Sequence, residues 1–207
     1  MVKSGSSSPT RTGSAGGKIL SGVLDNPSTL RTAEGLKKAP PPVKPKPNRL
    51  KPFNDTDKAN LRTYTNGGYL QINPYLRNPD GTGKPFRQKF QDKADAVSES
   101  LSKLPSEPGK TYRGSNLQKR PEELAKYQEG KIVKEDAFTS TSKNPGITES
   151  GQFAKDTRFT VNGKNGKNVT DYSDHDEEEI LFDKGTDFMV DKVTHNGRFT
   201  DIEMTEV

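Results

Sequence analysis

The sequence predicts an α+β domain in which helices come first and strands follow. Helical spacing of apolar residues dominates residues 57–130, and β-like segments with short polar connections fill the chain after Gly130. Elements in this order favour an α+β fold over alternating βαβ units. Neither pattern occurs in residues 1–50, so we expect the folded domain over residues 51–207.

Residues 1–50 are rich in Ser, Gly, Pro and Lys, and they run into the stretch KKAPPPVKPKPNRLKP. Repeated prolines favour extended polyproline II, so we predict a disordered basic linker, with an SH3-type ligand as the alternative. Only 27% of the 207 residues are hydrophobic and Trp is absent, which agrees with partial disorder. A linker at this position suggests the C-terminal part of a longer protein.

Several classes of site are disfavoured by composition. The chain has no Cys and only two His, so disulfides, a thiol nucleophile and a zinc site are not expected. No apolar stretch approaches the length that spans a membrane. The net charge of +5 is concentrated in residues 1–50, where a soluble linker explains it better than nucleic-acid binding does.

Three helical regions are predicted before Gly130. The first, over 57–77, is broken at Gly67-Gly68. The second begins at Asp92 as N-cap and ends before Pro105. The third runs from Pro121 to Gly130.

The strands are predicted mostly from alternating and β-branched segments. TYRG, ending at residue 114, is the first, and DAFTSTS, residues 136–142, is the second. The segment RFTVNGKNGKNV, residues 158–169, is interpreted as a hairpin with a Gly-Lys turn. Three further strands are expected at residues 178–182, 187–196 and 200–207.

Familiar catalytic motifs are missing. NGKNGK lacks the spacing and the following helix of a phosphate loop, and the Ser-Thr-Ser run has no nearby His-bearing motif for a hydrolase triad. Adjacent glutamates also fit a glycosidase poorly, because such enzymes take two carboxylates from separate elements. On a strand, Glu177 and Glu179 would share one face while Glu178 points away.

Three other motifs follow one another along the chain. An aromatic-Arg-Gly occupies residues 112–114, a Ser-Thr-Ser follows Phe138-Thr139, and a Glu-x-Glu at 177–179 enters Ile-Leu-Phe. In this order they resemble the R-S-E class of mono-ADP-ribosyltransferases, a family of bacterial toxins and ecto-enzymes that cleave NAD. The likeness continues through NGKNVTDYSDHDEEEILFDKGTDFMV and back to LRTYTNGGYLQINPYLR, so it covers residues 57–207.

The resemblance implies a fold and a substrate site. The fold would have two roughly perpendicular, mostly antiparallel sheets flanked by helices, with NAD as substrate in the cleft between them and no metal. Glu179 would stabilise the oxocarbenium-like ribose, and Glu177 would hold and deprotonate the guanidinium of a target arginine. Arg113 would bind the pyrophosphate, and Ser140 would orient Glu179.

Further residues are expected to contact NAD by the same resemblance. Phe153 would stack on nicotinamide and Arg158 would add a phosphate contact. The others are Gly114, Thr141, Tyr69 and Asn73. Asp174 stands where many of these toxins carry an aromatic residue, and Tyr172 is the candidate to replace it.

The resemblance also implies a biological role. We expect a secreted or injected toxin that acts in the cytosol of a target cell on an arginine of actin, a GTPase or a bacterial cytosolic protein. A cognate immunity protein is a further expected partner. An NAD glycohydrolase, which uses water as acceptor, is the alternative reaction, and an inactive adaptor with a basic tail is the alternative class.

Overall fold

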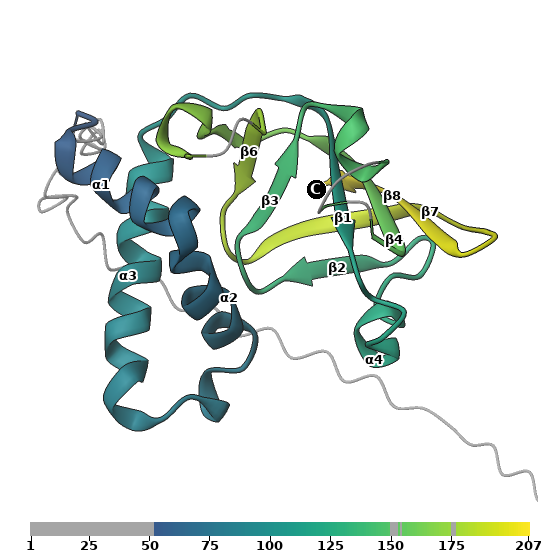
Figure 1. Ribbon diagram of the computed structural model, residues 1–207, viewed down its shortest axis with the longest axis horizontal. Coiled ribbons are helices and arrows are strands. Elements are labelled where there is room, and N and C mark those ends of the chain that lie inside the picture. The colour runs from purple at the N-terminus through teal and green to yellow at the C-terminus, as the bar shows by residue number, and fades with distance from the viewer. Residues whose placement is uncertain (1–51, 150–152, 154, 175–176) are drawn as a thin grey trace, which may run out of the picture. The chain divides into compact units, whose positions relative to one another are not determined.

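The computed structural model describes residues 52–149, 153, 155–174 and 177–207. The linker predicted at residues 1–50 lies outside these residues. In the described part the helices precede most of the strands, and the three helices within residues 55–102 lie together beside one end of the sheet (Figure 1). The predicted α+β class is therefore confirmed.

The first helical region is two helices joined at a kink. Helix α1 (Asp55–Thr63) is followed by the turn η1 (Tyr64–Gly68) and by α2 (Tyr69–Arg77). Within η1 the backbone leaves helical geometry at Asn66 and Gly67, and the φ of 115° at Gly67 suits glycine. The predicted break is confirmed at this position.

Two predicted helix boundaries were wrong. Helix α3 is Lys84–Ser102 and begins eight residues before Asp92, the predicted N-cap. It begins there because Pro85 is well placed in a first helical turn. Helix α4 is the single turn Pro121–Leu124. The chain then leaves the helix, and the ring of Tyr127 packs edge-on against Phe159 at 5.1 Å.

Eight strands form a hydrogen-bonded order of β2-β7-β8-β4-β1-β3-β6-β5. Every neighbouring pair is antiparallel except β4 and β8. The strands are β1 (Gly109–Ser115), β2 (Ile132–Glu135), β3 (Thr139–Ser142), β4 (Thr157–Gly163), β5 (Lys167–Asn168), β6 (Glu179–Phe182), β7 (Thr186–Asn196) and β8 (Phe199–Glu206).

The two predicted sheets are joined into this one order at a single point. Strands β1 and β3 share only the pair Tyr112 and Ser142. On one side of this junction lie five strands and on the other side three. In Figure 1, β3 and β6 run steeply across the direction of β2 and β7.

The predicted hairpin over residues 158–169 was wrong. Strand β4 pairs with β1 and β8, whereas β5 pairs with β6. The connecting segment wraps the ring of Phe182, since a Cβ at Gly163 would lie 2.5 Å from that ring. The buried carboxylate of Glu206 fixes the segment by accepting hydrogen bonds from the backbone N–H groups of Lys164 and Asn165.

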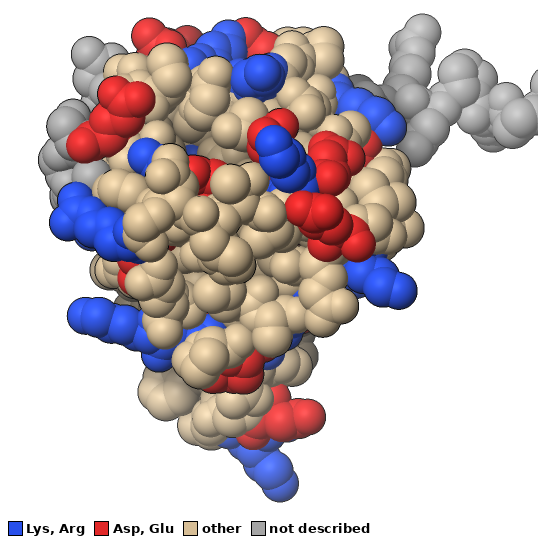
Figure 2. Space-filling view, turned by 90° about the vertical axis from the view of Figure 1, so that its right-hand side faces the viewer, with Lys and Arg blue, Asp and Glu red and all other residues tan. Residues whose placement is uncertain are grey.

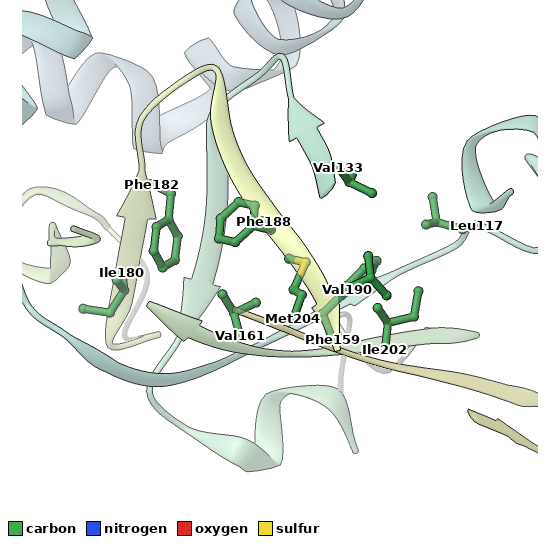
Figure 3. Close-up of a cluster of buried hydrophobic side chains, with 10 residues drawn as sticks. All are labelled: Leu117, Val133, Phe159, Val161, Ile180, Phe182, Phe188, Val190, Ile202 and Met204. Atoms are coloured by element: carbon green, nitrogen blue, oxygen red, sulfur yellow. The ribbon is translucent and has the colours of Figure 1, made fainter. Parts of the chain in front are cut away.

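Strand β6 is buried on both faces. Ile180 and Phe182 belong to a hydrophobic core formed mainly by strand residues. Figure 3 shows this core, which also contains Phe188 and Val190 of β7. Leu181 points the other way, into a second core with α1, α2 and α3. A strand covered on both faces reads as a continuous apolar run, which explains the Ile-Leu-Phe triplet.

The molecular surface carries mixed charge. On the face shown in Figure 2, Lys and Arg side chains are interspersed with Asp and Glu. Among the helices of the described residues, none is both long and apolar enough to cross a bilayer.

Candidate active site

A cavity of about 560 Å³ lies between the helical region and the strands. This volume is within the range of roughly 300–1,000 Å³ that small-molecule sites occupy. All but one of the residues predicted to contact NAD or to act in catalysis line the cavity. They are Tyr69, Asn73, Arg113, Gly114, Ser140, Thr141, Phe153, Glu177 and Glu179.

The two glutamates reach the cavity by a turn rather than by strand alternation. Glu179 opens β6 and is only 7% exposed, whereas Glu177 precedes the strand and is partly buried. Between them Glu178 has φ 47°, in the left-handed region, and its side chain is exposed. The predicted outcome for Glu178 is confirmed, but the geometric reason for it was wrong.

Strand β3 holds the backbone of this turn. The hydroxyl of Ser142 donates to the carbonyl oxygen of Glu177 at 2.5 Å, and the N–H of Lys143 donates to that of Glu178 at 3.2 Å. Ser142 also faces Glu179 in the strand register. The last serine of the Ser-Thr-Ser motif therefore fixes the segment that carries both carboxylates.

Ser140 and Thr141 occupy the same strand. Ser140 lines the cavity, and its carbonyl oxygen lies 3.5 Å from a guanidinium nitrogen of Arg113. Thr141 donates its hydroxyl to the carbonyl oxygen of Ile180, at 2.9 Å. The R-S-E residues thus meet in one cavity, and the hydrogen bond from Ser140 to Glu179 stays a prediction.

The helical wall of the cavity is aromatic. Tyr64 is buried, packs edge-on against Phe138 at 4.9 Å, and accepts a hydrogen bond from the Asn73 amide at 3.0 Å. Burial raises the pKa of the Tyr64 hydroxyl, and the negative charge of Glu179 raises it further. Tyr64 is therefore a neutral hydroxyl beside the carboxylate.

Gly114 makes room for the segment that carries Phe153. A Cβ at Gly114 would lie 1.8 Å from the carbonyl oxygen of Phe153 and 3.4 Å from Cγ of Lys155. No side chain fits there, so the close approach requires glycine at this position of β1. The structure thereby gives Gly114 a steric role at the rim of the cavity.

Arg158 is the predicted NAD contact that does not line the cavity, and Tyr172, the candidate to replace the missing aromatic residue, does not line it either. Its guanidinium donates to both carboxylate oxygens of Asp201, at 2.6 and 2.8 Å, and stacks over the ring of Phe199 at 4.2 Å. The hydrogen bond and charge of Asp201 raise the pKa of Arg158. The cation that lines the cavity from this part of the chain is Lys155.

Sequence reasoning missed several cavity residues. Lys155 lies two residues after Phe153, and its positive charge was the one feature of the sequence that indicated a phosphate contact there. Phe138 stands directly before the Thr-Ser-Thr-Ser strand, so its buried place beside Tyr64 was within reach of the motif. Ile147 lines the cavity without a pattern that marks it.

The cavity combines charges of both signs. Arg113 and Lys155 suit phosphate oxygens, while Glu177 and Glu179 suit cationic groups. A ligand that carries a pyrophosphate and a positively charged ring, together with a cationic acceptor, matches this arrangement. In the described ranges, no cluster of three or more His, Asp or Glu residues is placed to hold a metal ion.

Comparison with known proteins identifies the family. A family model described as ADP-ribosyltransferase exoenzyme matches residues 31–206. The chain belongs to this family. It is 33% identical over 164 residues to Tre1 of Pseudomonas putida, an NAD(+)–protein-arginine ADP-ribosyltransferase, and that alignment covers 78% of the chain and 31% of Tre1.

Solved structures agree with this ADP-ribosyltransferase assignment. The Vis ADP-ribosyltransferase in complex with agmatine superposes with a TM-score of 0.63 and 26% identity, covering 75% of each chain. Exoenzyme S of Pseudomonas aeruginosa, bound to carba-NAD and human 14-3-3 protein beta, superposes with a TM-score of 0.62 and 26% identity, covering 78% of each chain.

The chain spans only part of the length of its larger relatives. Its alignments cover between 18% and 31% of the length of three curated relatives that are 33% to 37% identical to it.

Proposed function

We propose that the chain transfers ADP-ribose from NAD to an arginine side chain of a target protein and releases nicotinamide. The observation that carries this proposal is the meeting of Glu177, Glu179 and Arg113 in one cavity. Tre1 is named for the same reaction, and Vis was solved with agmatine, a small guanidine.

The residues divide the chemistry between them. Arg113 and Lys155 bind the pyrophosphate, and Phe153 stacks on the nicotinamide ring. The glycosidic bond to nicotinamide breaks, and both bonding electrons leave with the ring nitrogen, which becomes neutral. Glu179 lies beside the ribose carbon that becomes positively charged and stabilises it electrostatically.

The acceptor completes the transfer. A guanidinium nitrogen of the target arginine forms the new bond to the ribose carbon, and its proton passes to Glu177. The burial of Glu179 strengthens its electrostatic effect, because the attraction is less screened than it would be in water. Asn73 and Tyr64 form the wall against which the nicotinamide ribose is held.

The biological setting belongs to the same proposal. The family description and the exoenzyme names of relatives support a secreted or injected toxin that works in the cytosol of a target cell. Its partners would be NAD and a protein with an exposed arginine, such as actin, a GTPase or a bacterial cytosolic protein. An immunity protein would protect the producing cell.

The test uses labelled NAD and mass spectrometry. Wild-type protein incubated with biotin-NAD and lysate should label proteins on arginine, and it should also modify agmatine. The Glu179→Gln variant should do neither. Consumption of NAD without label on any protein or on agmatine would instead establish a glycohydrolase.

A further inference from the structure

The turn η1 does more than connect two helices. It presents three consecutive side chains to the site region: Tyr64 and Thr65 line the cavity, and Asn66 bonds to a distant segment. The backbone leaves helical geometry at Asn66 and Gly67, so η1 is a kink between two helices rather than a continuous helical turn. At this kink the side chains of Thr65 and Asn66 bond to residues more than 100 positions later in the chain.

Two hydrogen bonds join η1 to the segment Tyr172–Asp174. The Thr65 hydroxyl lies 2.8 Å from the carbonyl oxygen of Tyr172. The Asn66 side-chain oxygen accepts from the backbone N–H of Asp174 at 3.0 Å. Both bonds reach the backbone of the segment, so they fix its path whatever side chains it carries.

The Thr65 hydroxyl has two other backbone carbonyl oxygens within reach, and both are farther away than that of Tyr172. Its single hydroxyl hydrogen has helical carbonyl oxygens within reach as well, at Leu61, 3.1 Å away, and at Arg62, 3.3 Å away. The oxygen of Tyr172 is the nearest of the three, and Thr65 is only 5% exposed. This short, partly buried hydrogen bond joins distant segments, and breaking it removes a donor from the carbonyl oxygen of Tyr172.

The segment held in this way leads directly to the acceptor carboxylate. It leaves the 3-10 turn η5 (Thr170–Tyr172), where the N–H of Val169 donates to the carbonyl oxygen of Glu179 at 3.0 Å. Ser173, within the segment, lines the cavity, and Glu177 follows Asp174 by three positions in the sequence. The chain is therefore bonded to β6 just before η5, and to η1 at Tyr172 and Asp174.

We propose that Thr65 and Asn66 are positioning residues that set the balance between transfer to arginine and hydrolysis of NAD. This inference rests on the proposed function. Glu179 is fixed by β6, so cleavage of NAD does not depend on the Tyr172–Asp174 segment. Glu177 precedes the strand: the Ser142 hydroxyl holds its carbonyl oxygen, and the hydrogen bond from Asp174 to Asn66 holds the backbone three residues earlier. Loosening η1 therefore lowers transfer more than hydrolysis.

The experiment compares two substitutions of Asn66, which does not line the cavity. Asn66→Ala removes the acceptor for the Asp174 N–H, and Asn66→Asp keeps an oxygen in its place. Nicotinamide release without acceptor and ADP-ribosylation of agmatine are measured on the same samples. The loss of one hydrogen bond should lower the ratio of transfer to hydrolysis about fivefold in Asn66→Ala. The ratio in Asn66→Asp should stay close to that of wild type.

Thr65 supplies an independent arm. Thr65→Val keeps the shape of the side chain but removes the hydroxyl, and it should raise KM for agmatine more than KM for NAD. Thr65→Ser restores the hydroxyl and should restore the wild-type KM ratio. Equal losses of transfer and hydrolysis in Asn66→Ala and Thr65→Val would overturn the inference, since a purely structural role affects both reactions alike.

Hydrogen exchange separates this inference from the proposed function. The amide of Asp174 should exchange faster in Asn66→Ala than in wild type, and this measurement needs no catalysis. Unchanged exchange would overturn the inference even if wild type transfers ADP-ribose. A wild-type protein that modifies neither agmatine nor protein would instead overturn the proposed function, and the role of η1 in transfer with it.

Discussion

The substitution Gly114→Ala tests how closely the cavity rim depends on one missing side chain. The new Cβ would start 1.8 Å from the carbonyl oxygen of Phe153, and real contacts of this kind are not shorter than 3.0 Å. The segment with Phe153 must therefore move by at least 1.2 Å. A displacement of about 1 Å at a substrate-positioning group costs roughly 100-fold in rate, or about 2.7 kcal/mol of transition-state stabilisation.

The assay is nicotinamide release over a range of NAD concentrations, with thermal unfolding recorded on the same protein. We expect kcat/KM for NAD to fall about 100-fold. The melting temperature should change little. Alanine reduces the conformational entropy of the unfolded chain, and this contributes about 0.4–1 kcal/mol to stability, which offsets part of the strain in the folded state. Loss of activity without loss of fold would show that the rim, rather than the whole domain, has moved.

Gly83→Ala is the matched control. A Cβ at Gly83 meets its nearest neighbour, a ring carbon of Phe86, at 3.9 Å, which is an ordinary contact. This variant should keep the wild-type kcat/KM. The steric reasoning is refuted if Gly114→Ala binds and cleaves NAD as well as Gly83→Ala does.

Three further predictions concern other residues. Glu179→Gln should lower nicotinamide release about 100- to 1,000-fold, as expected when one electrostatic stabiliser is removed, with an unchanged melting temperature. Burial tends to raise the pKa of Asp57, but hydrogen bonds, first that from Lys103, hold it below its ordinary value of 3.8. The ion pair of Asp57 with Lys103 therefore stabilises the fold above pH 3.8. This stabilisation is lost as the pH falls through the lower pKa of Asp57 in the folded protein. Asp57→Asn should lower the free energy of unfolding at neutral pH by about 3 kcal/mol and flatten its decline in acid, which urea titrations at several pH values will measure. Arg158→Ala should lower the free energy of unfolding by about 1–2 kcal/mol and leave KM for NAD unchanged, whereas Lys155→Ala should raise KM; the opposite pattern in NAD titrations would return the phosphate contact to Arg158.

Local patterns predicted much of the fold. The helix break at Gly67-Gly68 and the strand at Ile180–Phe182 follow from residue types that act within a few positions. Pairing between distant segments was not predictable in the same way. The short strand β2 was not singled out, and the hairpin over residues 158–169 failed because the ring of Phe182 and the carboxylate of Glu206 shape that segment from elsewhere.

The candidate site shows the same division. The order of the Arg-Gly, Ser-Thr-Ser and Glu-x-Glu motifs predicted most of the cavity lining, because the motifs lie on or directly before β1, β3 and β6, which are consecutive in the sheet. Arg158 was misplaced because its partner Asp201 lies on β8, which the sequence does not pair with β4 by any local signal. Glu178 was exposed as predicted, although its left-handed backbone has no sequence signature.

Strand β6 carries Glu179 and contributes side chains to both hydrophobic cores. A chain in which only one core has formed therefore lacks half of the packing that holds this carboxylate. Partly folded forms should be catalytically silent, and recovery of nicotinamide release during refolding should track the last core to assemble. In this architecture enzymatic activity therefore reports complete folding.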